Sequence, residues 1–159
     1  MSAEERLKWL NDQLDKFEQS IGLPVYVSSN EDYRKYMNLS NNELRALTSE
    51  ECREGAYLLS DYSYHVNKQM NRENSRAGWC EREIWRTIAP HLDQYKTSKY
   101  QSNDELKYLA MLDNEYADKL HRLQTGCLAR AEQLKNISHQ IDKIADRLSS
   151  LAYCKVQGK

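Results

Sequence analysis

The chain has 159 residues, of which 40% are apolar and 30% charged, and its formal net charge is −1. This composition is too polar for a large globular core, while its many leucines and tyrosines exclude a disordered chain. The 5 glycines and 2 prolines leave few places for sharp turns and favour long helices. No run of 18 apolar residues occurs and the first residues lack a secretory signal pattern, so we expect one cytoplasmic domain over residues 1–159, with no membrane contact.

The first predicted helix spans residues 2–21. Ser2 and Glu5 mark its start as a capping box, in which each side chain accepts a hydrogen bond from an otherwise free backbone N–H. Apolar residues then recur at alternating spacings of three and four, which predicts an interface with a partner helix or a second copy. These seam residues are Leu7, Leu10, Leu14, Phe17 and Ile21. Gly22 and Pro24 are expected to end the helix.

Residues 22–47 are predicted to form a connector that contains a short helix. Ser40 and Glu43 form a second capping box at the start of that helix. Thr48 and Glu51 form a third, which opens a much longer helix. The sequence therefore predicts a change from connector to long helix at residue 48.

The long central helix is predicted over residues 48–89. Pro90 ends it, because the proline ring cannot continue a helix and disfavours helical backbone at the preceding residue. Apolar side chains cluster on one face of the helical wheel and predict a continuous core face. They are Cys52, Leu59, Val66, Met70, Ala77, Ile84 and Ile88. The four cysteines form no CxxC pair and are expected to act as small apolar fillers.

A polar loop over residues 91–102 is predicted to lead into a last helix over residues 103–153. The later part of that helix carries a second seam, suited to another helix of this chain or of a second copy. Its residues are Leu134, Ile137, Ile141, Ile144, Leu148 and Leu151. Because the loop is short, the two long helices are expected to be antiparallel neighbours. The predicted fold is all-α: a long antiparallel, coiled-coil-like helical hairpin with an additional N-terminal amphipathic helix, assembled as a homo-oligomer.

Basic residues gather on the central helix opposite its apolar face. Residues 67–100 carry seven basic and four acidic side chains, so this stretch is locally positive. The candidate nucleic-acid-binding residues are Lys68, Arg72, Arg76, Trp79, Arg82, Arg86, Lys96 and Lys99. Arginine and lysine bind phosphates, and an exposed aromatic ring stacks on a base. This combination indicates sequence-tolerant binding of a single strand, and Tyr95 and Tyr100 add rings to the loop.

A plainer interpretation stays open. The basic face is then an ordinary solvated surface, with Glu73 and Glu83 pairing with arginines of the same helix and Trp79 packing on a neighbouring subunit. The four histidines are scattered, and neither a glycine-rich phosphate loop nor a nucleophile motif occurs. The sequence therefore predicts no metal site, no cofactor and no enzymatic activity.

Several segments of the chain resemble a family of small phage proteins. The segments are Tyr36–Glu51, Ala56–Leu59, Tyr62–Ser63 and Asn71–Trp79. They are similar to the phage T4-type recombination mediators of the UvsY family, and a looser likeness continues to about Leu151. The likeness excludes the first predicted helix, so the assembly geometry of the family does not transfer directly.

The resemblance implies an all-helical, ring-forming protein that loads a RecA-like recombinase onto single-stranded DNA coated by single-strand binding protein. It places the DNA path along Lys68, Arg72, Arg76, Arg82 and Arg86. We therefore predict a non-enzymatic, single-stranded DNA-binding recombination mediator, in the host cell cytoplasm if a phage encodes it. The alternative is a structural or adaptor coiled-coil protein, such as a phage assembly or virion component, that acts through helix–helix contacts.

Overall fold

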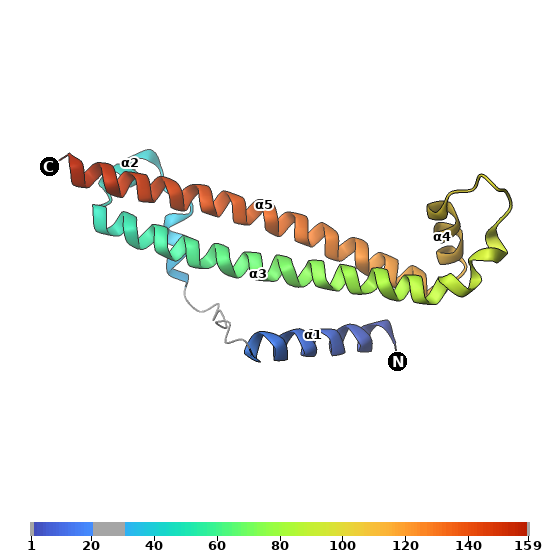
Figure 1. Cartoon of the computed structure of the whole chain (residues 1–159). Helices are drawn as coiled ribbons and strands as arrows, with labels where there is room; N and C mark the ends of the chain where they lie inside the picture. The colour runs from blue at the N-terminus through green and yellow to red at the C-terminus, as the bar shows by residue number, and fades with distance from the viewer. Residues whose placement is uncertain (1, 21–30, 159) are drawn as a thin grey trace. The chain divides into compact units, whose positions relative to one another are not determined.

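The computed structural model describes residues 2–20 and 31–158. Its elements are α1 (Ala3–Ser20), the 3-10 helix η1 (Glu31–Tyr36), α2 (Asn41–Ala46), α3 (Ser49–Ile88), the 3-10 helix η2 (Ala89–Tyr95), α4 (Asn103–Leu112) and α5 (Glu115–Gln157). These ranges contain no strand, so the all-α prediction is confirmed (Figure 1). No helix within them combines the length and apolar character that crossing a membrane requires. The predicted end of the first helix, at residues 21–24, lies outside the described residues.

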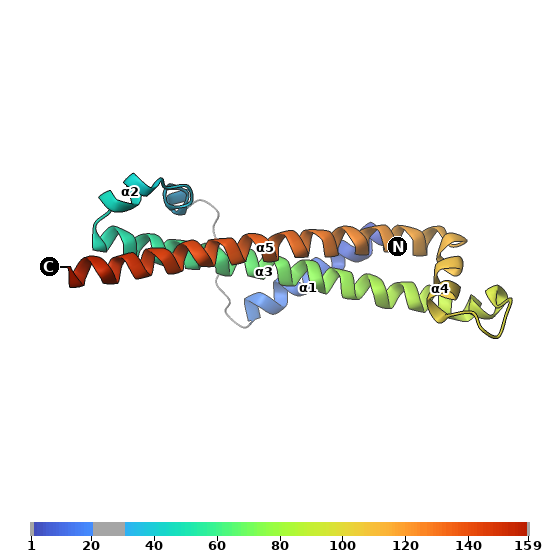
Figure 2. The ribbon, with the colours of Figure 1, turned by 90° about the horizontal axis from the view of Figure 1, so that it is seen from above.

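The two long helices α3 and α5 are antiparallel neighbours, as predicted (Figures 1 and 2). The Ser49 hydroxyl donates to the Ala152 carbonyl at 3.0 Å, and the Ser63 and Ser138 hydroxyls lie 2.9 Å apart. Residues near the start of α3 therefore contact residues near the end of α5, as expected for an antiparallel pair.

The chain divides into two compact units. Unit 1 contains α1, residues 71–88 of α3, η2, α4 and residues 115–131 of α5. Unit 2 contains η1, α2, residues 49–70 of α3 and residues 132–157 of α5. The assignment of residues 1–159 to a single domain stays a prediction.

All three predicted capping boxes form. The pairs are Ser2 with Glu5, Ser40 with Glu43 and Thr48 with Glu51. In each pair the carboxylate accepts from the backbone N–H of the capping residue at 2.6–2.7 Å, and the glutamate N–H donates to the capping hydroxyl at 3.1–3.3 Å. The backbone hydrogen bonds hold the pKa of all three glutamate carboxyls below the ordinary value. The caps therefore explain why α1, α2 and α3 begin where they do.

The core of unit 2 is apolar and lies along the contact of α3 with α5. It contains Leu59 from α3 with Ile141 and Leu148 from α5, each 0% exposed. The seam predicted for the last helix thus packs largely against a helix of the same chain. The two hydroxyls of Ser63 and Ser138 are also buried here, where they satisfy each other.

The first helical segments of unit 2 are fastened to α3 and α5 by specific contacts. The Tyr36 ring is 1% exposed and lies over Gly55 of α3, where an added Cβ would come within 2.6–2.8 Å of ring carbons. The Tyr33 ring stacks on Tyr62, with centroids 3.9 Å apart. The Lys155 ammonium donates to three carbonyl oxygens at the C-terminal end of α2, where a positive charge is favourable. The connector therefore holds ordered structure in residues 31–47.

Unit 1 has an apolar core of its own and buries charged groups besides it. Its buried apolar residues are Cys80, Ile84, Ile88, Ala110, Met111, Ala117 and Leu120. Burial raises the pKa of the Cys80 thiol to about 11, as for an apolar filler, and Cys52 and Cys127 are buried as well, whereas Cys154 is exposed. Glu73 and Glu83 are buried to 8% and 6% exposure. Unit 1 therefore pairs a modest apolar core with carboxylates that need partners.

The predicted single helix over residues 103–153 is wrong, because α4 and α5 are separate helices. Asp113 ends α4, and Asn114 begins α5 by accepting a hydrogen bond from the Ala117 N–H at 3.0 Å. Asparagine caps helices well because its side chain competes for backbone N–H groups. Apolar residues keep the same spacing across this break, so the spacing alone did not indicate the turn.

The predicted polar loop over residues 91–102 is also wrong in its first part. α3 ends at Ile88, as the proline predicts, but residues 89–95 continue as the 3-10 helix η2. Pro90 is tolerated in the first turn of η2 because its missing N–H would have no partner there. Leu92 and Tyr95 then pack against the core of unit 1, and α4 packs against η2.

Candidate nucleic-acid interface

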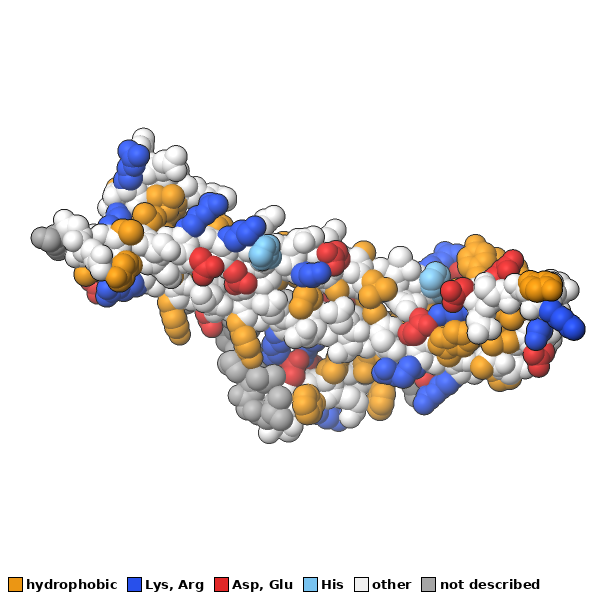
Figure 3. Space-filling view, turned by 45° about the horizontal axis from the view of Figure 1, so that its top comes forward, with side chains coloured by type: hydrophobic (Ala, Val, Ile, Leu, Met, Phe, Trp, Pro, Cys, Tyr) orange, Lys and Arg blue, Asp and Glu red, His pale blue; other side chains and the backbone are white. Residues whose placement is uncertain are grey.

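The candidate interface is the basic stripe, defined as Lys68, Arg72, Arg76, Arg82 and Arg86 of α3. Helical geometry places these side chains within about a third of the helix circumference. The four arginines belong to unit 1, whereas Lys68 belongs to unit 2 and is partly buried. On the face drawn in Figure 3, basic side chains are interspersed with acidic and hydrophobic ones rather than gathered in one field.

Helix α1 covers the first two arginines of unit 1. The Arg72 guanidinium binds both carboxylate oxygens of Glu18, at 3.0 and 2.8 Å, and also contacts the Asp15 carboxylate. The hydrogen bonds from Glu18 and Asp15 raise the pKa of Arg72, and its side chain is only 20% exposed. The Arg76 guanidinium donates to the Asn11 side-chain oxygen at 2.8 Å. These contacts join residues more than fifty positions apart, so the helical pattern of the sequence gave no signal for them.

Two buried carboxylates of α3, those of Glu73 and Glu83, pair with arginines of the basic stripe. Glu73 accepts from Arg76 at 2.6 Å and from Arg130 of α5 at 2.9 and 3.0 Å. Burial alone would raise the pKa of Glu73, but the hydrogen bond from Arg130 and the nearby positive charges lower it overall. Glu83 accepts from Arg86 at 2.9 Å and from Arg6 of α1 at 2.6 Å. The predicted pairing of Glu73 and Glu83 with arginines of their own helix is therefore confirmed.

A different subset of the basic residues is open to solvent. Arg82 is exposed, and the Arg86 side chain is 78% exposed despite its ion pair. Lys96 and Lys99 are exposed in the segment between η2 and α4, next to Tyr100, which is 98% exposed. All five residues belong to unit 1. This subset, which we call the open basic patch, is the part of the predicted site that an anion can reach without moving the chain.

The predicted stacking residue Trp79 is not on the open surface. It is partly buried and packs against the core of unit 1, as does Tyr95. Tyr100 is therefore the aromatic ring of the open basic patch that a base can approach. The exposure of Tyr100 could not be read from spacing, because it follows from its place in a segment that leaves the core.

Some of the residues predicted to form oligomer or partner interfaces are buried within the chain, and others are exposed. Ile141 and Leu148 lie in the core of unit 2, with Leu134, Ile144 and Leu151 packed around them. Of the α1 seam, Leu7 packs on the core of unit 1, and Leu10 and Leu14 are partly buried. Phe17 and Ile137 are 60% and 43% exposed. These two remain accessible to another chain.

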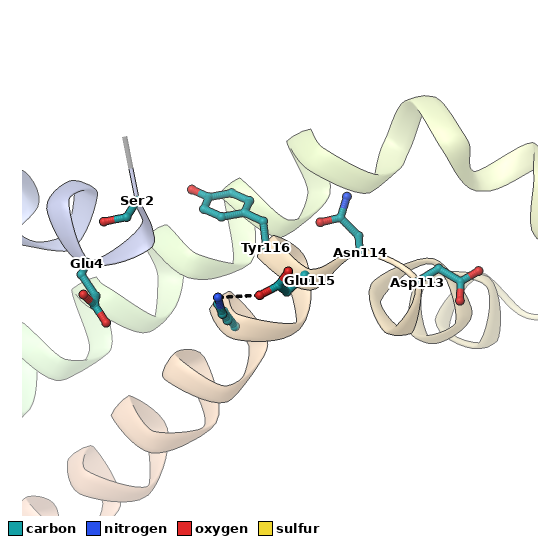
Figure 4. Close-up of a pocket in the computed structure, with 7 residues that line it drawn as sticks. Ser2, Glu4, Asp113, Asn114, Glu115 and Tyr116 are labelled. Carbon is teal, nitrogen blue, oxygen red and sulfur yellow. Dashed lines mark hydrogen bonds and ion pairs between the residues drawn. The ribbon is translucent and has the colours of Figure 1, made fainter.

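An open hollow lies where the start of α1 faces the turn between α4 and α5 (Figure 4). It is lined by Ser2, Glu4, Asp113, Asn114, Glu115, Tyr116 and Lys119. The Glu115 carboxylate accepts from Lys119 at 2.7 Å, an ordinary surface pair. The described ranges also contain no group of three or more His, Cys, Asp or Glu residues placed to hold a metal ion.

No protein-family model, curated protein or solved structure matches the chain.

Proposed function

We propose that the chain is a non-enzymatic, single-stranded DNA-binding recombination mediator. In this role it helps to load a RecA-like recombinase onto single-stranded DNA coated by single-strand binding protein, and it acts as a homo-oligomer. The observation that carries the proposal is the open basic patch, where exposed cations lie in one unit with an almost fully exposed tyrosine.

The proposed mechanism is capture of the DNA backbone followed by stacking of a base. Arg82, Arg86, Lys96 and Lys99 contact phosphates and release the counterions that surround the strand. Tyr100 then stacks on a base, which requires no particular sequence because every base has a flat face. A single patch of this size binds weakly, so several copies in one oligomer supply affinity through multivalency.

The first test is fluorescence anisotropy with a labelled oligo-dT at about 50 and about 200 mM salt, beside a duplex control. We expect salt-dependent binding that favours the single strand. The Arg82→Glu, Lys99→Glu double variant should bind at least about tenfold more weakly at the lower salt. Its matched control is Lys143→Glu with Arg147→Glu, the same charge change at exposed positions of α5 in unit 2. Equal effects of the two double variants would contradict the proposed site.

A second variant separates stacking from charge. Tyr100→Ala removes an exposed ring without touching the core, so the helical circular dichroism should not change. Binding of oligo-dT should weaken by about tenfold while its dependence on salt stays the same, because no phosphate contact is lost. A changed salt dependence with unchanged affinity would contradict the stacking role.

The second candidate function is that of a structural or adaptor protein that acts through helix–helix contacts. The exposed apolar side chains of Phe17 and Ile137 favour it, since both continue predicted seams. Ile137→Asp tests it better than a change at the fully buried Ile141, which would damage the core. Under this alternative, Ile137→Asp with Phe17→Ser shifts the assembly to smaller species in analytical ultracentrifugation, and the open-patch variants have no effect on any partner.

A further inference from the structure

We propose that α1 is a built-in competitor of single-stranded nucleic acid, which holds Arg72 and Arg76 until phosphates replace it. This inference rests on the proposed function, since it concerns regulation of the same binding surface. The competing group is the α1 clasp, defined as Asn11, Asp15 and Glu18.

The clasp presents to Arg72 the same chemistry as a phosphate. Glu18 accepts two parallel hydrogen bonds from the guanidinium, at 3.0 and 2.8 Å, and Asp15 adds a second carboxylate. Arginine binds carboxylate and phosphate in the same bidentate manner, so one group can take the place of the other. The spacings of four and three residues put all three clasp side chains on one face of α1.

The attachment of α1 is polar enough to be reversible. Leu7 packs on the core of unit 1 and Leu10 and Leu14 are partly buried, but the large side chains of Trp9 and Phe17 are 55% and 60% exposed. The clasp and the Arg6–Glu83 pair supply ionic contacts that a charged ligand can replace. In the structure α1 therefore occupies Arg72 and Arg76, which belong to the same unit as the open basic patch.

Competition predicts a changed dependence on salt. A phosphate contact by Arg72 releases counterions from the strand in either protein. In the wild type the same step frees the Asp15 and Glu18 carboxylates, which attract cations from solution and offset part of that release. Without these two charges the offset is absent, so the logarithmic salt dependence of the binding constant should be steeper, by no more than about 0.7 for each phosphate contact.

The test compares oligo-dT binding by the full-length protein and by the Asp15→Asn, Glu18→Gln double variant. We expect the variant to bind roughly five- to tenfold more tightly at low salt, with a steeper salt dependence. The matched control is Glu4→Gln with Asp12→Asn, which removes the same charge from exposed positions of the same helix. Asn11→Asp should have the opposite effect. It places a carboxylate against Arg76, so oligo-dT binding should weaken.

The outcomes separate this inference from the proposed function. If neither the wild type nor the clasp variant binds oligo-dT, the proposed function fails and this inference fails with it. If the wild type binds and the clasp variant gains no more than its control, only the competition is overturned. Hydrogen exchange gives an independent readout: amides of residues 6–20 should lose protection when oligo-dT binds, and unchanged or increased protection would overturn the competition.

Discussion

Units 1 and 2 use the same pair of long helices but bury different side chains between them. In unit 2 the contact of α3 with α5 contains fully buried leucine and isoleucine and one pair of serine hydroxyls. Unit 1 has an apolar core as well, but there α3 also buries Glu73, which pairs with Arg76 and with Arg130 of α5, and Glu83, which pairs with Arg86 and with Arg6 of α1. Burying a carboxylate costs free energy that ion pairs recover only in part. Unit 2 thus buries mainly apolar side chains, whereas unit 1 also buries carboxylates that are paired with arginines.

The largest effect should come from the apolar contact of unit 2. Leu148→Ala removes a side chain that is 0% exposed and leaves a cavity, so the free energy of unfolding should fall by about 3 kcal/mol. Urea unfolding followed by circular dichroism measures it. Leu151→Ala, at a partly buried position of the same seam, is the control and should cost clearly less. Equal losses would mean that unit 2 is not organised around this contact.

A smaller loss is expected where η1 meets α3. Gly55→Ala places a methyl group 2.6–2.8 Å from carbons of the Tyr36 ring, which is closer than van der Waals contact. Overpacking of this kind lowers the free energy of unfolding by about 2 kcal/mol. Gly78→Ala is a matched control, because the nearest atom to its added Cβ is the end of the Arg82 side chain at 3.7 Å. The control should be neutral or stabilising in thermal unfolding. An equally tolerated Gly55→Ala would show that Tyr36 is not held against the helix.

Unit 1 offers a change that affects stability and binding in opposite directions. Glu73→Gln removes the charge that Arg76 and Arg130 share, so unfolding should become easier by about 1 kcal/mol, a modest loss because the Arg130 side chain is 55% exposed. Binding of oligo-dT should tighten, because Arg76 loses its ion pair with Glu73. A variant that loses both stability and binding would argue that the buried carboxylate positions the basic stripe.

The smallest effect concerns the helix caps and pH. The pKa values of Glu5, Glu43 and Glu51 are lowered in the folded state, so each cap stabilises the protein above the ordinary carboxyl pKa. That stabilisation is lost as pH falls below about 4.5 and through the folded pKa. The thermal unfolding temperature should therefore decline below pH 4.5, and the triple Gln variant of these residues should decline less. A midpoint that rises on acidification would contradict the sign.

Local patterns predicted much of the fold. The capping boxes, the proline stop after Ile88 and the seam containing Ile141 and Leu148 depend on neighbours in the sequence, and the structure confirms them. The break at Asn114 was missed because the apolar spacing runs through it, although an asparagine before Glu115 is a recognisable cap signal.

The candidate site was less accessible to sequence reasoning. The basic stripe could be drawn on a helical wheel, and its pairing with Glu73 and Glu83 followed from their spacing. The covering of Arg72 by α1 is a tertiary contact with no local signature. Trp79 was expected to be free, but a large ring at the edge of a small core gains more from burial than from exposure.

DNA binding by unit 1 is tested most directly by hydrogen exchange of the whole chain with and without oligo-dT at low salt. We expect increased protection in residues 78–100 of unit 1 and no change in the α3 and α5 segments of unit 2. Increased protection confined to unit 2, or none anywhere at a concentration where the strand is in excess, would contradict the assignment of DNA binding to unit 1.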